Sequence, residues 1–289
     1  MLQKILRHLF YRGIYEMKLW KKIVASVAIA LPVFALAACG NSSSSSSANK
    51  TVKVGIMTND KEIWQDIQKR LKKQDVNIKL VEFTDYNTPN KALDDGDIQL
   101  NSFQTVQFMD AWNKKHKDTI TSVGNTYLGP MRAYSNKIKS LSALKKGDTV
   151  SVPNDAANEG RALQLLEQKG IIKLKSGVTN PTTRDITENK LNLKITELDA
   201  AQTARSMNDV DAAIVNNDIA AAAKLTPSKA ISVEKIGKNS APFINIIAAA
   251  SKKDKKNATY KKIVKAYQTS QTEKLMKKYY KGSTVPAWK

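Results

Sequence analysis

Hydrophobic and polar positions alternate regularly from residue 51 onward and predict strands followed by helices. The segment "TVKVGIM" at 51–57 has the two-residue period of a strand. In "DKEIWQDIQKRLKKQ", Ile63, Ile67 and Leu71 recur at helical spacing, which predicts a helix over 60–74. The series continues with a strand at 76–83, a helix at 88–97, a strand at 98–101 and a helix at 103–116.

A second series of strands and helices begins near Tyr134. Strands are expected at 148–153, 193–199, 210–215 and, in the apolar "PFINIIAAA", 242–250. Helices are expected at 158–170, 200–208, 216–225, 257–269 and 270–280. The connections between them are short, which favours an α/β fold with a largely parallel sheet. The two series suit two lobes with a ligand cleft between them, because ligands of open α/β sheets bind beyond the carboxyl ends of strands.

The segment before residue 51 has the layout of an export signal. "MKLWKKIVASVAIALPVFALAACG" at 17–40 joins a basic start, an apolar stretch over 23–36 and small residues before Cys39, as in a secretory signal peptide. "LAAC" resembles a lipobox, which predicts cleavage after residue 38 and a lipid on Cys39. The alternative is a transmembrane anchor, but the apolar stretch is shorter than the about 20 residues of a span. Residues 1–16 precede this signal and are interpreted as an upstream extension.

The charge of the chain fits a protein held just outside a membrane. After Cys39, the serine-rich segment 39–50 is predicted to be a flexible tether, so we expect a lipid-anchored domain at the extracytoplasmic face of the cell membrane. Lys and Arg number 47 against 26 Asp and Glu, a net charge of +21. Such a surface could meet anionic lipid or wall polymers. The lysines are spread over several helices, which favours a generally solvated surface, and no nucleic-acid-binding motif is present.

The residue types that most enzymes need are scarce. The chain has one cysteine, Cys39, and two histidines, His8 and His116. It has no G-x-S-x-G, G-x-G-x-x-G or Walker A motif, and zinc sites need several Cys or His ligands. We therefore expect no catalysis, no cofactor and no metal. A binding protein asks for less: a cleft with an apolar lining and a few fixed polar groups.

The segment "VPNDAANEGRALQLL" at 152–166 offers such polar groups. Asn154 or Asn158 could cap the helix that follows Pro153. The free N–H groups at a helix start bind anions, and the guanidinium of Arg161 can hold a carboxylate with two parallel hydrogen bonds. This pattern indicates a ligand carboxylate at Arg161. The alternative is an ordinary surface arginine in the first helical turn.

Four segments, in this order, carry a resemblance to a known family. They are "VEFTDYNTPNKALDDGDIQLNSFQ" at 81–104, "YSNKIKSLSALKKGDTVSVPNDAANEGRALQLLEQKGIIKL" at 134–174, "DAAIVNND" at 211–218 and "NSAPFINIIAA" at 239–249. Together with the lipobox, they resemble the NlpA-type methionine-binding lipoproteins, the substrate-binding components of methionine ABC importers. The likeness extends over 51–289.

The resemblance implies a fold, partners and roles for particular residues. The fold would be the two-lobe, type 2 periplasmic-binding-protein-like fold, with lobe one formed by 51–133 plus 240–289 and lobe two by 134–239. The partners would be methionine (L- or D-) and the ABC permease and ATPase subunits. Arg161 would hold the ligand carboxylate with support from Asn158, and Asn216 would contact the backbone groups of the ligand. Tyr86 and Phe103 would line the side-chain pocket; without the resemblance, both are explained as well by core packing.

Two positions depart from the family pattern. Thr105 stands where a histidine is usual and Phe108 where a tyrosine is usual. The two positions lie one helical turn apart, so both could contact the ligand and set its side-chain preference. Because a pocket that loses hydrogen-bonding groups can change specificity, the ligand could be another amino acid or a short Met-containing peptide. An enzyme or an adhesin built on the same fold is the alternative from another class.

Overall fold

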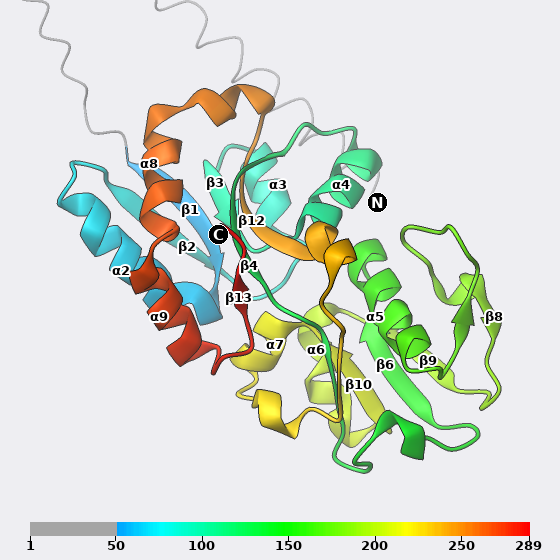
Figure 1. The fold of residues 1–289 in the computed structure, drawn as a ribbon. Helices are drawn as coiled ribbons and strands as arrows, with labels where there is room; N and C mark the ends of the chain where they lie inside the picture. Colours follow the sequence, from blue (N-terminus) through cyan, green and yellow to red (C-terminus); the bar gives the residue numbers. More distant parts are fainter. Residues whose placement is uncertain (1–50) are drawn as a thin grey trace, which may run out of the picture. The chain divides into compact units, whose positions relative to one another are not determined.

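A computed structural model describes residues 51–289, which form two β-sheets flanked by helices (Figure 1). The N-terminal signal, Cys39 and the tether lie outside the described residues. The first sheet has the strand order β13-β4-β12-β3-β1-β2. Its strands are β1 (Val52–Met57), β2 (Ile78–Phe83), β3 (Leu100–Ser102), β4 (Thr121–Leu128), β12 (Ile244–Ala249) and β13 (Val285–Pro286).

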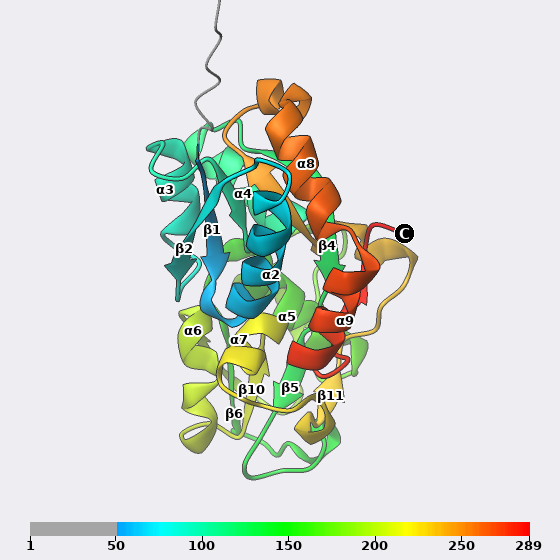
Figure 2. The same ribbon diagram turned by 90° about the vertical axis from the view of Figure 1, so that its left-hand side faces the viewer.

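Helices cover both faces of the first sheet, which explains why residues 246–249 of the central strand β12 are all apolar and buried. Ile247 and Ala249 of β12 belong to the cluster with α2 (Lys61–Lys72), α8 (Ala258–Tyr267) and α9 (Ser270–Tyr279). Ile246 and Ala248 point to the opposite face and pack with α3 (Pro89–Asp94) and α4 (Val106–His116). Successive side chains of a strand face opposite sides, so a strand covered on both faces has no polar alternation. Figure 2 shows α2, α8 and α9 together on one side of this sheet.

The second sheet has the order β11-β5-β10-β6-β9. Its strands are β5 (Arg132–Tyr134), β6 (Thr149–Pro153), β9 (Lys194–Leu198), β10 (Ala212–Val215) and β11 (Ser232–Val233). Its helices are α5 (Ala156–Gln168), α6 (Ala200–Thr203) and α7 (Asn217–Ala222), and a hairpin of β7 (Lys173–Leu174) and β8 (Ile186–Glu188) lies apart from the sheet. Ile214 of β10 packs in the cluster with α5, whereas Val215 packs in the cluster that also contains Tyr86 and Phe103. This last cluster joins the two lobes.

The expectation of largely parallel sheets is wrong for about half of the structure. The pairs β1–β2, β1–β3, β6–β9 and β6–β10 are parallel, but β12 runs antiparallel to β3 and β4, and β5 runs antiparallel to β10 and β11. The reason lies in the two chain crossings. The chain leaves the first sheet along β4 and returns to it along β12, so these neighbours run in opposite directions. It enters the second sheet along β5 and leaves it along β11, so these two are antiparallel as well.

The α/β, two-lobe fold is as expected, whereas the exact lobe boundaries stay a prediction. β5 begins at Arg132 and pairs with β10 of the second sheet. Sheet membership therefore favours a first crossing at 129–131, slightly before the expected boundary after residue 133. The second crossing lies between β11 and β12, in the range 234–243. Within residues 51–289, no helix is both long enough and apolar enough to cross a membrane.

Candidate functional site

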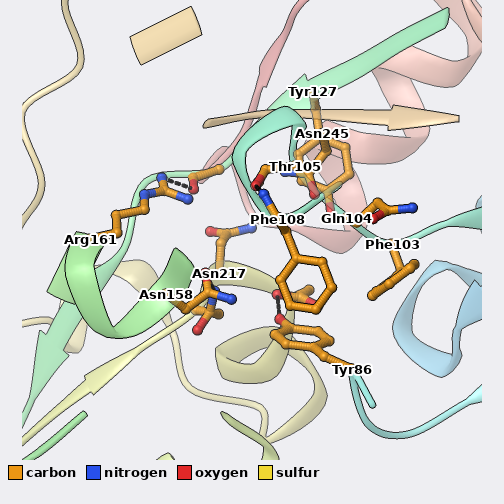
Figure 3. Close-up of a pocket in the computed structure, with 13 residues that line it drawn as sticks. Tyr86, Phe103, Gln104, Thr105, Phe108, Tyr127, Asn158, Arg161, Asn217 and Asn245 are labelled. Atoms are coloured by element: carbon orange, nitrogen blue, oxygen red, sulfur yellow. Dashed lines mark hydrogen bonds between the residues drawn. The ribbon is translucent and has the colours of Figure 1, made fainter. Parts of the chain in front are cut away.

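All seven residues expected to bind ligand line one pocket (Figure 3). They are Tyr86, Phe103, Thr105, Phe108, Asn158, Arg161 and Asn216. They come from both lobes and meet where the strands β6 and β10 end and the helices α5 and α7 begin. The lining also contains six residues that the sequence analysis missed: Gln104, Tyr127, Gly129, Asn217, Asp218 and Asn245.

Helix α5 begins earlier than the sequence pattern suggested. It starts at Ala156, and its N-cap is Asp155, whose side chain accepts a hydrogen bond from the backbone N–H of Asn158. The expectation that Asn154 or Asn158 caps this helix is therefore wrong. Asp155 is a good cap because its carboxylate sits next to the free N–H groups of the first turn. Arg161 consequently lies in the second turn, with only 4% of its side chain exposed, and is not a surface arginine.

The guanidinium of Arg161 already holds a carboxylate of the protein. Its Nε donates to Oε1 of Glu234 at 2.8 Å, and its Nη2 donates to Oε2 of Glu234 at 2.6 Å. Nη2 also donates to the carbonyl oxygen of Gly129 at 2.9 Å, and the guanidinium carbon lies 4.4 Å from the centre of the Phe243 ring. Of the three nitrogens of this guanidinium, Nη1 alone has no hydrogen-bond partner among the described residues. An incoming anion would therefore meet Nη1 and not the fork formed by Nε and Nη2.

Glu234 is the main residue that sequence reasoning missed at this end of the pocket. It is 73 positions from Arg161 and directly follows the edge strand β11. Its Oε2 also accepts a hydrogen bond from the backbone N–H of Met131 in one of the two crossings. The pair therefore ties α5 to both crossing segments. No local signal in "ISVEKIG" indicates that this acid is buried or paired.

A relay of side-chain amides fixes the orientation of Asn216. Nδ2 of Asn158 donates to both carboxylate oxygens of Asp155, at 3.0 and 2.9 Å, so its Oδ1 must face the other way. That oxygen accepts from Nδ2 of Asn216 at 2.8 Å. Because the Nδ2 group of Asn216 is used in this contact, its Oδ1 is left buried and without a hydrogen-bond partner among the described residues.

Three aromatic rings form the apolar wall of the pocket. The ring centres of Tyr86 and Phe103 are 6.0 Å apart, those of Tyr86 and Phe108 6.1 Å, and those of Phe103 and Phe108 5.5 Å. These separations are typical of tilted and edge-to-face aromatic pairs. In Figure 3 the three rings lie together, at a distance from Arg161. A thioether would be well accommodated there, because sulfur packs favourably against aromatic rings.

Thr105 lines the pocket and also begins a helix. It is the N-cap of α4, and its hydroxyl accepts a hydrogen bond from the backbone N–H of Phe108 at 3.1 Å. The two positions that depart from the family pattern are thus linked to each other. A histidine at 105 could not supply the same short hydroxyl cap, so this substitution changes the start of α4 as well as the pocket surface.

Helix α7 brings three consecutive polar residues, Asn216, Asn217 and Asp218, to the pocket. Oδ1 of Asn217 accepts from Nη1 of Arg132 at 2.7 Å, and Oδ1 of Asp218 accepts from the hydroxyl of Tyr86 at 2.6 Å. Gly129 packs against this turn so closely that a Cβ atom there would lie 2.9 Å from Cβ of Asn217. A residue with a side chain at 129 would therefore displace α7 or close part of the pocket.

Burial, more than any charged neighbour, sets the ionisation of the acids near α7. It raises the pKa of Asp218, and the hydrogen bond from Tyr86 offsets this only in part. Burial likewise raises the pKa of Tyr86 well above its usual value, and the adjacent Asp218 carboxylate raises it further. A carboxylate kept here without a cationic neighbour costs free energy. Within residues 51–289, no group of three or more His, Cys, Asp or Glu could hold a metal ion.

Comparisons with known proteins point to one family. The family described as NlpA lipoprotein matches residues 52–288. The probable D-methionine-binding lipoprotein MetQ of Vibrio cholerae is 38% identical over 277 residues, covering 94% of this chain and all of that protein. A nutrient-binding protein from Burkholderia cenocepacia bound to methionine is 46% identical, with a TM-score of 0.78 over 82% of this chain and 99% of that one.

A third relative is named as part of a transporter. The substrate-binding protein of a methionine transporter from Streptococcus pneumoniae is 39% identical, with a TM-score of 0.78. The alignment covers 82% of this chain and 96% of that structure.

Proposed function

Because the chain belongs to the NlpA lipoprotein family, we propose that it captures methionine outside the membrane and delivers it to an ABC importer. It acts by binding, without catalysis, and its ligand sits in the pocket between Arg161 and the aromatic wall. Named relatives bind methionine or D-methionine, and one belongs to a methionine transporter. These names support the proposal across nearly the whole length of the chain.

The single observation that carries the proposal is the composition of the pocket. A buried guanidinium, a set of buried amide and carboxyl groups and a wall of three aromatic rings line the same pocket. The polar groups suit the carboxylate and amino group of an amino acid, and the rings suit an apolar side chain. We assign the carboxylate contact to Arg161, through Nη1, and contacts with backbone groups of the ligand to Asn216.

The test is to identify the ligand directly. Protein purified under mild conditions should carry a small molecule that denaturation releases and mass spectrometry identifies as methionine. Ligand-stripped protein should then bind L- or D-methionine with one-to-one stoichiometry by calorimetry. A different co-purified molecule, with no heat of methionine binding, would contradict the proposal.

The membrane anchor is the second part of the proposal. We assign it to a lipid on Cys39, because this cysteine follows a signal sequence and the relatives are named lipoproteins. Cys39→Ala should release the protein from the membrane fraction or leave the uncleaved precursor. A cleaved Cys39→Ala protein that stays in the membrane fraction would contradict lipid anchoring there.

The ligand's side chain is assigned to the region near Thr105 and Phe108. Neither residue offers the hydrogen-bonding groups usual at these positions in the family, so the pocket should tolerate other apolar side chains besides that of methionine. Closure of the two lobes on the ligand is the expected motion, with the hinge at the two chain crossings.

A further inference from the structure

The start of helix α7 carries three buried polar atoms that the protein itself leaves without partners. They are Oδ1 of Asn216, Nδ2 of Asn217 and Oδ2 of Asp218, in three successive residues that all line the pocket. Folded proteins satisfy most buried polar groups, so three together at a pocket wall need an explanation. A bound molecule that donates hydrogen bonds to the two oxygens supplies one for Asn216 and Asp218.

The chemistry of these atoms specifies the kind of group that is missing. Oδ1 of Asn216 and Oδ2 of Asp218 are both hydrogen-bond acceptors, and the Asp218 carboxyl can carry a negative charge. Their complement is therefore a group with several N–H donors and a positive charge. A primary ammonium group has three N–H donors and one positive charge, so it can donate to both kinds of acceptor.

Neither acceptor is free to turn away from the pocket. Asp218 is 7% exposed, and its other oxygen accepts a hydrogen bond from the hydroxyl of Tyr86. The relay through Asn158 holds Nδ2 of Asn216, which leaves its Oδ1 buried and without a partner among the described residues. The two acceptors are thus positioned before any ligand binds, which reduces the entropy lost on binding.

The protein offers Asp218 no ion-pair partner of its own. Among the described residues, Asp218 forms no ion pair, and the nearby Arg161 directs its fork to Glu234. Arg132 directs Nη1 to the amide oxygen of Asn217 and to a backbone carbonyl. Burial raises the pKa of Asp218, and the hydrogen bond from Tyr86 and the charge of Arg161 offset this only in part.

We propose that Asp218, together with Oδ1 of Asn216, binds the ammonium group of the ligand. The inference rests on the proposed function and extends it: the ligand must carry a free, protonated amine in addition to its carboxylate. The ammonium can belong to an α-amino acid or to the N-terminus of a short peptide. Amines blocked by acylation, or replaced by a hydroxyl group, would leave the Asp218 carboxylate buried without compensation.

The experiment compares methionine with its 2-hydroxy analogue, which keeps the carboxylate and the thioether and replaces the ammonium by a hydroxyl. Wild-type protein should prefer methionine by about 100-fold or more, since a buried charge-assisted pair is lost with the analogue. Asp218→Asn should shrink this preference at least tenfold while changing the affinity for the hydroxy acid less than threefold. Asp209→Asn, at an exposed position, is the matched control and should change neither affinity.

A stability measurement separates ligand binding from a merely structural role. Asn has the shape of Asp without the charge, so Asp218→Asn should raise the melting temperature of the ligand-free protein while it weakens methionine binding. A residue that only supports the fold would lower the melting temperature. Equal losses of affinity for methionine and the hydroxy acid, or an unchanged affinity for methionine, would overturn the proposal.

Further ligands distinguish this inference from the proposed function. Glycyl-methionine tests the peptide as the source of the ammonium, and N-acetyl-methionine removes the charge from the amino acid. Tight binding of an amino acid other than methionine would contradict the proposed function. The role of Asp218 would then be tested by comparing that amino acid with its own 2-hydroxy analogue. Wild-type protein that binds N-acetyl-methionine as well as methionine, or that binds no free amine, would contradict the inference.

Discussion

The two polar ends of the pocket are built in opposite ways. At the Arg161 end, a buried guanidinium and a buried carboxylate compensate each other, and both are 4% exposed. At the α7 end, Asp218 is nearly as buried but has a hydroxyl for a partner and one oxygen without any. At the first end the two charges compensate each other without a ligand, and Nη1 of Arg161 is left for the ligand carboxylate; at the second end the ligand supplies the missing cation. Glu234 should therefore matter most for stability and Asp218 most for binding, whereas Arg161 contributes to both.

The largest effect is expected at the complete end. Glu234→Gln leaves the guanidinium of Arg161 buried without a charged partner, and breaking such a pair typically costs about 3–5 kcal/mol. Urea denaturation of the ligand-free protein should show this loss. Glu188→Gln is the control, because its ion pair with Lys173 is exposed and should contribute little to stability.

A double substitution tests whether the stability loss in Glu234→Gln comes from the unpaired charge of Arg161. Arg161→Leu combined with Glu234→Leu removes both charges, so it should recover most of the stability lost in Glu234→Gln. It should not recover ligand binding, because no Nη1 group remains. Stability in Glu234→Gln within about 1 kcal/mol of wild type would show that the pair is not the structural element described here.

A second uncompensated carboxylate lies close to the α7 end. Asp60 is 2% exposed, and burial raises its pKa from 3.8 to about 7, although the hydroxyl of Tyr280 donates to it at 2.7 Å. The negative charge of Asp218 raises it further. At pH values between 3.8 and about 7, Asp60 keeps its proton in the folded protein, whereas the unfolded chain has released it. The free energy of unfolding should therefore fall as the pH rises from about 4 to about 7, by at most about 4 kcal/mol.

Asp60→Asn should remove the part of this pH dependence that Asp60 contributes. The amide oxygen can still accept the hydrogen bond from Tyr280, but no charge appears at higher pH. The variant should therefore be more stable than wild type at pH 8, the opposite sign to Glu234→Gln. The measurement is a series of urea titrations from pH 4 to pH 8. An unchanged slope against pH in Asp60→Asn would show that another group is responsible.

The amide relay offers a smaller and more local test. Asn158→Ala removes two hydrogen bonds to Asp155 and the one from Asn216. We expect a stability loss of about 1–3 kcal/mol and weaker ligand binding, because Asn216 can then rotate its oxygen away from the pocket. Asn136→Ala, which breaks one exposed hydrogen bond to Asn208, is the control. Unchanged ligand affinity in Asn158→Ala would separate the relay from binding.

The smallest effects are expected where the chain departs from its family. Thr105→His with Phe108→Tyr loses the cap of α4, which typically costs about 1 kcal/mol, and adds hydrogen-bonding groups beside the aromatic wall. The variant should rank a panel of L- and D-amino acids differently from wild type in thermal-shift measurements. Thr105→Ser, which keeps the capping hydroxyl, should retain both the stability and the ranking. An identical ranking in all three proteins would show that these positions do not set specificity.

The sequence predicted best those features that depend on local periodicity. The helix expected over 60–74 forms as α2 (Lys61–Lys72), and the strand in "PFINIIAAA" forms as β12. The strands β4, β5 and β11 were not predicted. β4 has polar residues on both faces in "TSVGNTYL", and β5 and β11 are two or three residues long, so none has a clear hydrophobic pattern. Their pairing depends on how the chain crosses between the lobes.

In the candidate site, too, residues with a local sequence signal were predicted and residues that depend on distant contacts were not. Arg161 lies in a helix that directly follows a strand, and this local signal indicated a ligand carboxylate, whereas the ligand contacts of Asn158 and Asn216 were implied by the family resemblance. Glu234 could not be found this way, because what matters is its pairing with Arg161, 73 positions away. Asp218 lies within "DAAIVNND", but its role depends on burial and on its lack of an ion-pair partner, which no local pattern reveals.

A structure of the protein with methionine bound tests the contrast between the two ends most directly. It should place the ammonium nitrogen within about 2.7–3.2 Å of Oδ2 of Asp218 and of Oδ1 of Asn216. The ligand carboxylate should lie at Nη1 of Arg161, with the pair between Arg161 and Glu234 intact. A ligand whose amine points away from α7, or whose carboxylate displaces Glu234 from Arg161, would contradict the account.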